Sequence, residues 1–225
     1  MFLEVHIAGK IIAEMEILTF SLGQLQANCY LVIEDKQCLI IDPADSAEFI
    51  LEEIARRSLQ LIGLLATHGH FDHLMAVGEI QLSFPKLPLY IHPKDNFLVK
   101  RLNETAKYFL GQKTEVVLPQ KCEPLAEGQL AIDNFKFQVI FTPGHTPGGC
   151  SYYFPKEAVV FTGDTLFSNS IGRYDFSYSS KGALIKSVEK ILRLQETTTI
   201  YPGHGEVTLV QTEKVGDIRH FLEIV

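Results

Sequence analysis

The chain of 225 residues is long enough to bury a substantial core in one domain. Its charged and apolar fractions, 21% and 46%, are typical of a globular protein, and its net charge of −7 argues against a nucleic-acid partner, because no basic stripe is available to neutralise phosphates. No apolar run approaches the roughly 20 residues of a membrane helix, and the first residues do not resemble a signal peptide. We therefore expect a cytoplasmic protein with no membrane partner.

The hydrophobic pattern predicts strands and helices within a single domain, residues 1–225. Residues 2–8 and 11–19 alternate around Gly9-Lys10, which predicts a turn there, and we interpret residues 1–13 as an extra N-terminal hairpin. Further strands are predicted at residues 30–33, 38–41, 61–66, 89–91, 135–141, 151–154, 159–161 and 197–201. Helices are predicted at residues 45–59, 74–82, 93–102 and 181–194, and from residue 209 onward.

Three local features qualify this outline. Asp45 or Ser46 is expected to cap the first helix. Residues 103–134 show no clear period, and we expect a lid or loop over a site there. Residues 30–42 and 151–164 both form a predicted hairpin that ends in an aspartate, which hints at an architecture of two similar halves.

The four cysteines, Cys29, Cys38, Cys122 and Cys150, are scattered along the chain without CxxC spacing. In a cytoplasmic protein they indicate free, partly buried thiols. None lies in a context typical of a nucleophile.

The densest group of metal-binding side chains follows the predicted strand at residues 61–66. His68, His70, Asp72 and His73 all lie within six residues. A solvated polar turn would explain such a cluster poorly, because four coordinating groups directly after a buried strand are the pattern of a metal site.

Three later side chains share the same context. His145, Asp164 and His204 each follow an apolar strand across a short turn of Thr, Pro or Gly. Because strand ends can meet at one edge of a fold, we expect all seven groups to converge. The other three histidines, His6, His92 and His220, are interpreted as structural.

Seven ligands are too many for one tetrahedral metal and fit two metals that share a bridging carboxylate. Imidazole and carboxylate donors together suit zinc, iron or manganese. A water held between two such metals loses a proton near neutral pH and becomes a strong nucleophile. The pattern therefore predicts a hydrolytic centre.

At this point the sequence resembles the metallo-β-lactamase superfamily, whose T-H-x-H-x-D-H motif matches residues 67–73. The resemblance implies an α+β fold, a four-layer αβ/βα sandwich, with two divalent metals at one edge and zinc as the expected ion. It also implies the division of ligands. His68, His70 and His145 would hold the first metal, Asp72, His73 and His204 the second, and Asp164 would bridge them, with Asp72 and Asp164 taking part in catalysis.

Within that superfamily the chain is most similar to the short bacterial glyoxalase II-like hydrolases. The matching segments are residues 28–31, 41–43, 142–148, 170–176 and 202–205. The resemblance implies hydrolysis of a small-molecule thioester, such as a hydroxyacylglutathione, or of a related ester. It implies that Asp42 supports the first metal loop, and Arg173 or Tyr174 could contact the substrate.

The chain departs from this group at two places that concern the substrate. The usual Gly-Arg-Thr-Asp is Gly-Arg-Tyr-Asp at residues 172–175, and we expect no C-terminal helical domain of the kind that supplies glutathione contacts. An alternative is an oxidoreductase similar to persulfide dioxygenases, with one iron on His68, His145 and Asp164. The presence of every second-site ligand favours hydrolysis over that alternative.

Overall fold

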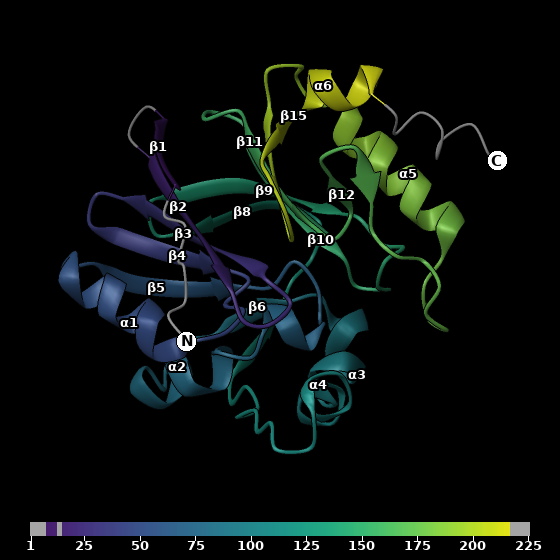
Figure 1. Ribbon diagram of the computed structural model, residues 1–225. Helices are drawn as coiled ribbons and strands as arrows, with labels where there is room; N and C mark the ends of the chain where they lie inside the picture. Colours follow the sequence, from purple (N-terminus) through teal and green to yellow (C-terminus); the bar gives the residue numbers. More distant parts are fainter. Residues whose placement is uncertain (1–7, 13–14, 217–225) are drawn as a thin grey trace.

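Two β-sheets lie face to face in the computed structural model, which describes residues 8–12 and 15–216 (Figure 1). The first sheet has the strand order β1-β2-β3-β4-β5-β6-β7 and the second the order β15-β14-β11-β10-β9-β8. The first sheet comprises Ala8–Ile12 (β1), Met15–Leu22 (β2), Ala27–Glu34 (β3), Gln37–Ile41 (β4), Gln60–Leu65 (β5), Leu89–Ile91 (β6) and Cys122–Pro124 (β7). The second comprises Gly128–Ile132 (β8), Phe135–Phe141 (β9), Cys150–Phe154 (β10), Val159–Gly163 (β11), Thr199–Pro202 (β14) and Thr208–Leu209 (β15). A separate pair is formed by Leu166–Phe167 (β12) and Ser170–Ile171 (β13).

Helices cover the outer face of each sheet (Figure 1). Ala47–Arg56 (α1), Val77–Ser83 (α2) and Leu102–Leu110 (α4) contribute to the core on the outer face of the first sheet. Lys181–Leu192 (α5) and Val210–Val215 (α6) do the same for the second sheet. Three shorter pieces are Phe71–His73 (η1), Pro93–Asp95 (η2) and Asn96–Val99 (α3). The predicted αβ/βα sandwich is therefore confirmed.

The interior between the sheets is rich in aromatic rings. Phe137 stacks on Phe154 with ring centroids 5.0 Å apart, and Phe161 stacks on Tyr201 at 5.1 Å. Tyr30, from the first sheet, meets Phe161 of the second edge-on at 5.0 Å. Such pairs add about 0.5–1.5 kcal/mol each to the burial of their large apolar surfaces. The first two pairs pack neighbouring strands within the second sheet, whereas the Tyr30–Phe161 pair joins the two sheets, and with them the strand ends that carry the polar side chains.

Strand direction brings the ends of strands from both sheets to one edge. In the first sheet β4 and β5 are parallel. In the second, β9 and β11 both run antiparallel to β10, and β14 runs parallel to β11. The carboxyl ends of β9, β11 and β14 therefore lie at the same edge, where His145, Asp164 and His204 follow them.

The two halves of the fold repeat one pattern. Strands β3 and β4 form a hairpin, and α1 then leads to β5, which lies parallel beside β4. Strands β10 and β11 form a hairpin in the same way, and the chain returns through α5 to β14, parallel beside β11. The similarity predicted for residues 30–42 and 151–164 corresponds to these matching units.

The predicted turn at Gly9-Lys10 is wrong. Gly9 pairs with Leu18 and Lys10 with Ile17, so both residues lie inside β1, and the pairing continues to Ile12 and Met15. Glycine is a weak turn signal on its own, because an edge strand such as β1, with a partner on one side only, tolerates it. Residues 1–7 and 13–14, which complete the predicted hairpin, lie outside the described residues.

The start of α1 also differs from the prediction. Ser46 has a φ of 59° and makes no side-chain bond to the helix, while the Asp45 carboxylate accepts the Ser46 N–H at 2.6 Å. Neither side chain caps the helix. The left-handed residue turns the chain sharply between the polar edge and α1.

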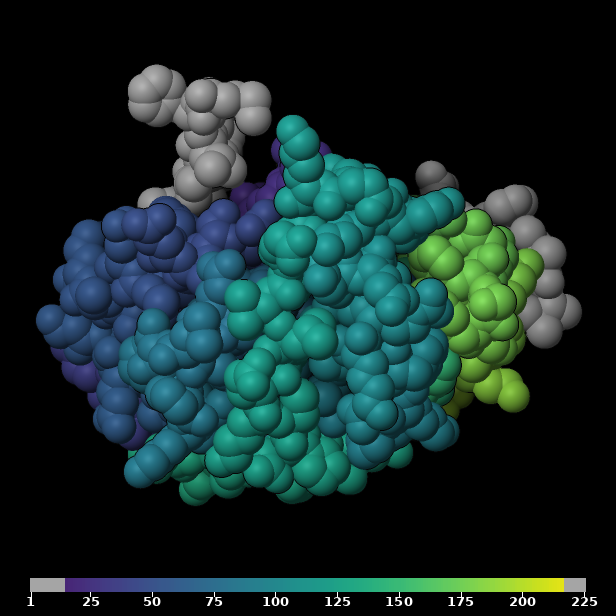
Figure 2. Space-filling view, turned by 90° about the horizontal axis from the view of Figure 1, so that it is seen from below, coloured from purple at the N-terminus to yellow at the C-terminus, as the bar shows by residue number. Residues whose placement is uncertain are grey.

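The segment at residues 103–134 is more regular than a loop. It contains most of α4 and the strands β7 and β8, which extend the two sheets beside β6 and β9. In Figure 2 the blue-green chain from α2 to α4 covers the face between α1 and the yellow-green α5. Over the described ranges, no helix is long and apolar enough to cross a bilayer.

Candidate metal centre

Three imidazole nitrogens meet at one point at the edge of the first sheet. His70 Nδ1 lies 3.1 Å from His68 Nε2 and 2.9 Å from His145 Nε2. His68 and His70 belong to the loop that follows β5, and His145 follows β9 in the other sheet. Asp164 joins this group with Oδ2 at 3.3 Å from His145 Nε2.

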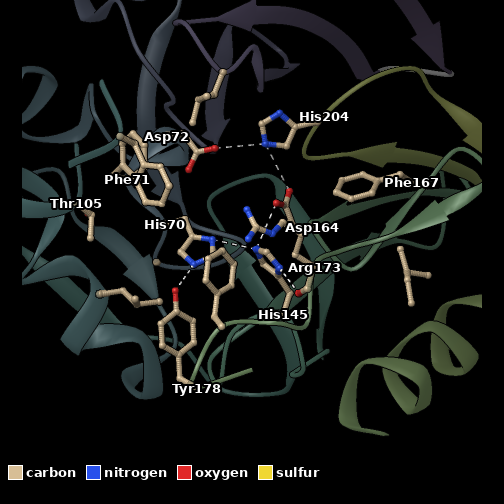
Figure 3. A pocket seen from close by; sticks show the side chains of 16 residues that line it. His70, Phe71, Asp72, Thr105, His145, Asp164, Phe167, Arg173, Tyr178 and His204 are labelled. Atoms are coloured by element: carbon tan, nitrogen blue, oxygen red, sulfur yellow. Dashed lines mark hydrogen bonds and ion pairs between the residues drawn. The ribbon is translucent and has the colours of Figure 1, made fainter. Parts of the chain in front are cut away.

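A second group lies beside the first. His204 Nε2 is 3.4 Å from Asp72 Oδ2, and His73 Nε2 is 3.7 Å from the same oxygen. Asp72 and His73 lie in η1, while His204 follows β14. Figure 3 shows Asp72, His204 and Asp164 directed toward one another.

Asp164 lies between the two groups. Its Oδ2 faces His145 Nε2, and its Oδ1 lies 3.4 Å from His73 Nε2 and 3.9 Å from His204 Nε2. Each carboxylate oxygen thus faces a different group of imidazoles. The structure brings together all seven side chains that the sequence predicted to converge.

The outer nitrogen of each imidazole has an oxygen partner. His145 Nδ1 lies 2.8 Å from the Arg173 carbonyl and His204 Nδ1 lies 3.3 Å from the Gln26 carbonyl. A carbonyl can only accept, so these Nδ1 atoms carry the proton and each Nε2 presents its lone pair to the site. The partners of the other three rings are Asp42 Oδ2 for His73 Nδ1 (3.0 Å), Tyr178 Oη for His70 Nε2 (2.8 Å) and Thr67 Oγ1 for His68 Nδ1 (3.0 Å). Such partners fix the orientation and tautomer of metal-binding histidines.

Electrostatics distinguishes His68 and His70 from His73. Burial lowers the pKa of His68 well below its ordinary value, and burial together with His145 lowers the pKa of His70 to about 3. Both rings are therefore neutral, as a metal ligand must be. Burial also opposes protonation of His73, but the nearby carboxylates, chiefly Asp72 and then Asp164, outweigh it and raise its pKa to about 10. The second group therefore has a potential that attracts a cation.

The residues present fit a pair of divalent metals. His73 Nε2 and Asp164 Oδ1 are buried and lack a hydrogen-bond partner within the described structure. Buried polar atoms are rarely left unpaired without a reason, and a cation between them would satisfy both. Five imidazoles and two carboxylates also form a donor set that zinc, iron and manganese accept.

Asp42 makes hydrogen bonds that orient histidines of both groups. It is fully buried, and its Oδ1 accepts the Thr67 N–H at 2.7 Å while its Oδ2 accepts the Thr67 hydroxyl at 2.7 Å. The same Oδ2 accepts His73 Nδ1–H at 3.0 Å. Asp42 thus orients His73 directly and reaches His68 through the Thr67 hydroxyl, a wider contact than the support of the first metal loop expected from the sequence.

Asp95 is a supporting residue that the sequence analysis missed. Its buried carboxylate accepts the Gly69 N–H at 2.9 Å, the Thr146 hydroxyl at 2.7 Å and the Gly148 N–H at 2.6 Å. It therefore ties the loop of His68 and His70 to the loop of His145. One signal was available: Asp95 follows β6, which runs parallel to β5, so its position at the same edge could have been inferred.

Two further contacts fix the last histidine loop. Asn28 Nδ2 donates to the carbonyls of Pro202 and Gly205, each at 3.0 Å. A Cβ at Gly203 would lie 2.2 Å from Asp164 Oδ1 and 2.8 Å from His73 Cε1. The loop therefore approaches the bridging carboxylate so closely that only glycine fits.

A cavity of about 390 Å³ opens over the polar groups. Five of the seven predicted ligands line it, namely His70, Asp72, His145, Asp164 and His204. Its walls consist of Leu25, Phe71, Leu98, Phe109, Phe167, Ile171, Phe176 and Tyr178, with Gly69, Thr105 and Arg173 (Figure 3). His68 and His73 lie beneath this floor.

The two predicted substrate contacts differ in position. Arg173 lines the cavity, and its guanidinium makes a bidentate pair with Asp175 at 2.9 and 3.0 Å. Tyr174 does not line the cavity, and the Lys181 ammonium lies 5.6 Å from the centre of its ring. The structure therefore gives no support for a substrate contact by Tyr174.

His92 has a local role, as predicted. Its Nδ1 accepts the Lys94 N–H at 3.2 Å, and its ring stacks on Phe141 with centroids 4.6 Å apart. Cys29, Cys38 and Cys150 are buried free thiols, whereas Cys122 is exposed. His6 and His220 lie outside the described residues.

Comparisons with known proteins agree with this geometry. The family model of the metallo-beta-lactamase superfamily matches residues 22–204. The chain is 35% identical over 193 residues to Probable metallo-hydrolase YqgX of Bacillus subtilis, covering 85% of this chain and 91% of that protein. It is 36% identical over 202 residues to Hydroxyacylglutathione hydrolase GloC of Haemophilus influenzae, covering 89% and 95%.

A solved structure supports the same assignment. The chain is similar to TTHA1623 in a di-iron-bound form, with a TM-score of 0.81 and 36% identity over 88% of this chain and 96% of that one. The match, the layered fold and the two His/Asp groups at its edge agree with one another. The chain therefore belongs to the metallo-β-lactamase superfamily, and its clusters are the metal-binding clusters of a metallo-hydrolase.

Proposed function

We propose that this protein hydrolyses a thioester or a related ester with the help of two divalent metal ions. The observation that carries the proposal is the position of Asp164, whose two oxygens each face a complete group of imidazoles. A protein that held one metal would not need Asp72, His73 and His204 placed as a second group.

The side chains have distinct tasks in this proposal. His68, His70 and His145 would hold one metal, Asp72, His73 and His204 the other, and Asp164 would contact both. Two bound divalent ions would polarise the carbonyl of the substrate and lower the pKa of a water to near 7.

Asp72 has a second task because it lines the cavity. Burial opposes its ionisation, but His73 and His204 outweigh that effect and hold the pKa of Asp72 below its usual value. The ionised carboxylate can therefore accept a hydrogen bond from a water that enters the cavity and orient it toward the substrate carbonyl.

The proposed class of substrate is supported by the similarity of the chain to a known hydrolase. The similarity to GloC, named a hydroxyacylglutathione hydrolase, favours a thioester. The metal could be zinc, which the sequence led us to expect, or iron, as in the di-iron-bound TTHA1623. Elemental analysis of the purified protein decides between them.

The test compares two carboxylate variants in assays with thioester, lactone and β-lactam substrates. Asp164→Ala should lower metal-dependent kcat/KM by more than about a hundredfold, because loss of mere supporting contacts at metal sites typically costs 10- to 100-fold. Glu206→Ala is the matched control, since Glu206 is exposed and lies two residues from His204. Full turnover by Asp164→Ala would sink the proposal, and oxygen uptake with a single iron per chain would favour the oxidoreductase alternative.

A further inference from the structure

The walls of the cavity are apolar and aromatic although its floor is strongly polar. Two pairs of stacked aromatic rings line the cavity wall. Phe71 and Phe109 have centroids 5.6 Å apart and an interplanar angle of 14°, and Phe176 and Tyr178 lie 5.4 Å apart at the same angle. Phe71 lies on the side of Asp72, and Tyr178 beside His70 (Figure 3).

The few polar wall groups are already engaged. The Thr105 hydroxyl donates to carbonyls of its own helix, at Arg101 and Leu102. The Tyr178 hydroxyl meets His70 Nε2 at 2.8 Å. The wall therefore offers little to a substrate that needs hydrogen bonds.

Arg173 is the only arginine or lysine among the described residues that line the cavity, and its charge is paired. The Arg173 guanidinium is paired in bidentate fashion with Asp175 and lies 4.6 Å from the centre of the Phe176 ring. A glutathione thioester carries a carboxylate at each end of its tripeptide, and a wall that bound the whole tripeptide would desolvate these charges at a high cost without an unpaired cation on the wall.

Phe109 contributes exposed apolar surface to the cavity wall. It extends from α4 over the cavity and is 52% exposed, although its other side stacks on Phe71, which is buried. An exposed ring on the wall of a concave site is typical of a surface that a ligand covers. Its neighbour Tyr108 is 80% exposed and does not line the cavity.

We infer that the preferred substrate is an uncharged thioester or ester with an apolar or aromatic substituent, which packs between the Phe71–Phe109 pair and the Phe176–Tyr178 pair. This inference rests on the proposed function and narrows it away from glutathione conjugates. Because full burial of each methylene raises kcat/KM by roughly fourfold, four added methylenes should raise kcat/KM by up to roughly 200-fold.

The experiment measures kcat/KM of the metal-loaded protein on four thioesters. Acetyl and hexanoyl groups are each joined to uncharged N-acetylcysteamine and to glutathione. We expect the hexanoyl N-acetylcysteamine thioester to be the best substrate. Equal rates for the two acyl groups, or a preference for the glutathione pair, would overturn the inference while leaving thioester hydrolysis intact.

Variants on α4 locate the effect. Phe109→Ala should lower the ratio of hexanoyl to acetyl kcat/KM by about tenfold, and Tyr108→Ala should leave both rates within twofold. If no thioester is hydrolysed, the proposed function fails and the cavity is tested by binding of the uncharged dye N-phenyl-1-naphthylamine. Absence of binding, or binding that Phe109→Ala does not weaken, would then refute an apolar ligand.

Discussion

Asp95→Asn tests whether one buried carboxylate holds two ligand loops together. The aspartate accepts three hydrogen bonds, from the Gly69 N–H, the Thr146 hydroxyl and the Gly148 N–H. An asparagine has one acceptor oxygen, so its NH2 group must face at least one of these donors whichever way the amide is turned. At least one backbone or hydroxyl donor is then left unpaired in a buried position.

The expected change in the free energy of unfolding combines two losses with one partial gain. A buried unpaired donor costs about 1–3 kcal/mol, and a bond to a charged acceptor contributes about 1.5–3 kcal/mol. Burial raises the pKa of Asp95, which means that removal of the charge recovers part of the desolvation cost. We therefore expect a net loss of about 1–3 kcal/mol, which for a chain of this size lowers Tm by roughly 3–10 °C. The shifted ligand loops should also weaken metal binding by about tenfold.

The assays are thermal unfolding of the metal-free protein and competition for metal with a chelator. Asp133→Asn is the control, because Asp133 is exposed in a turn with a φ of 48°, a conformation that asparagine adopts readily. If Asp95→Asn keeps the Tm and the metal affinity of the wild type, Asp95 does not join the loops as argued.

Three further outcomes follow from the same site. Tyr178→Phe removes the oxygen partner of His70 Nε2 and should weaken metal binding by about tenfold in a chelator competition; unchanged affinity would contradict a positioning role. Since the pKa of His73 is raised to about 10, metal binding at pH 7 must displace a proton, so affinity should increase with pH, and calorimetry in buffers of different ionisation enthalpy should detect the release. Gly203→Ala places a Cβ 2.2 Å from an oxygen of the bridging aspartate and should abolish turnover, whereas Gly182→Ala, which meets nothing within 4 Å, should not.

The ligands could be predicted because their chemistry is local in the sequence. Residues 67–73 hold four donors in one short segment, and each later ligand lies within four residues of the end of an apolar strand. Strand direction determines at which edge of a sheet a strand ends. A short group of metal-binding side chains after a strand therefore indicates a site at that edge. The layered fold required the resemblance to a known family in addition, because the pattern of strands and helices does not state which strands pair.

The supporting and wall residues were missed because their roles depend on tertiary contacts; the strand before Asp95 indicates the edge at which it lies but not the groups that it contacts. Asp95 reads as a polar residue inside a predicted helix, and it is the packing of β6 beside β5 that turns it toward Gly69. Phe109 reads as part of an irregular apolar run, and only the path of α4 over η1 places its ring against the cavity. Such roles arise from segments far apart in the chain, for which a single sequence carries no pattern.

The metal-binding side chains form the floor of the cavity and the aromatic side chains form its wall. This separation suggests that the substrate preference can change while the metal-dependent reaction stays the same. The ligands lie at strand ends that two aromatic-rich sheets hold rigidly, so a substitution there disturbs the metals and the fold together. Phe109 instead projects from α4 on the outer layer, and its half-exposed ring makes no contact that the sheets need. A change at Phe109 should therefore alter which acyl groups are accepted without moving the donors that activate water, which makes the wall the place where relatives with the same metal centre can differ in substrate.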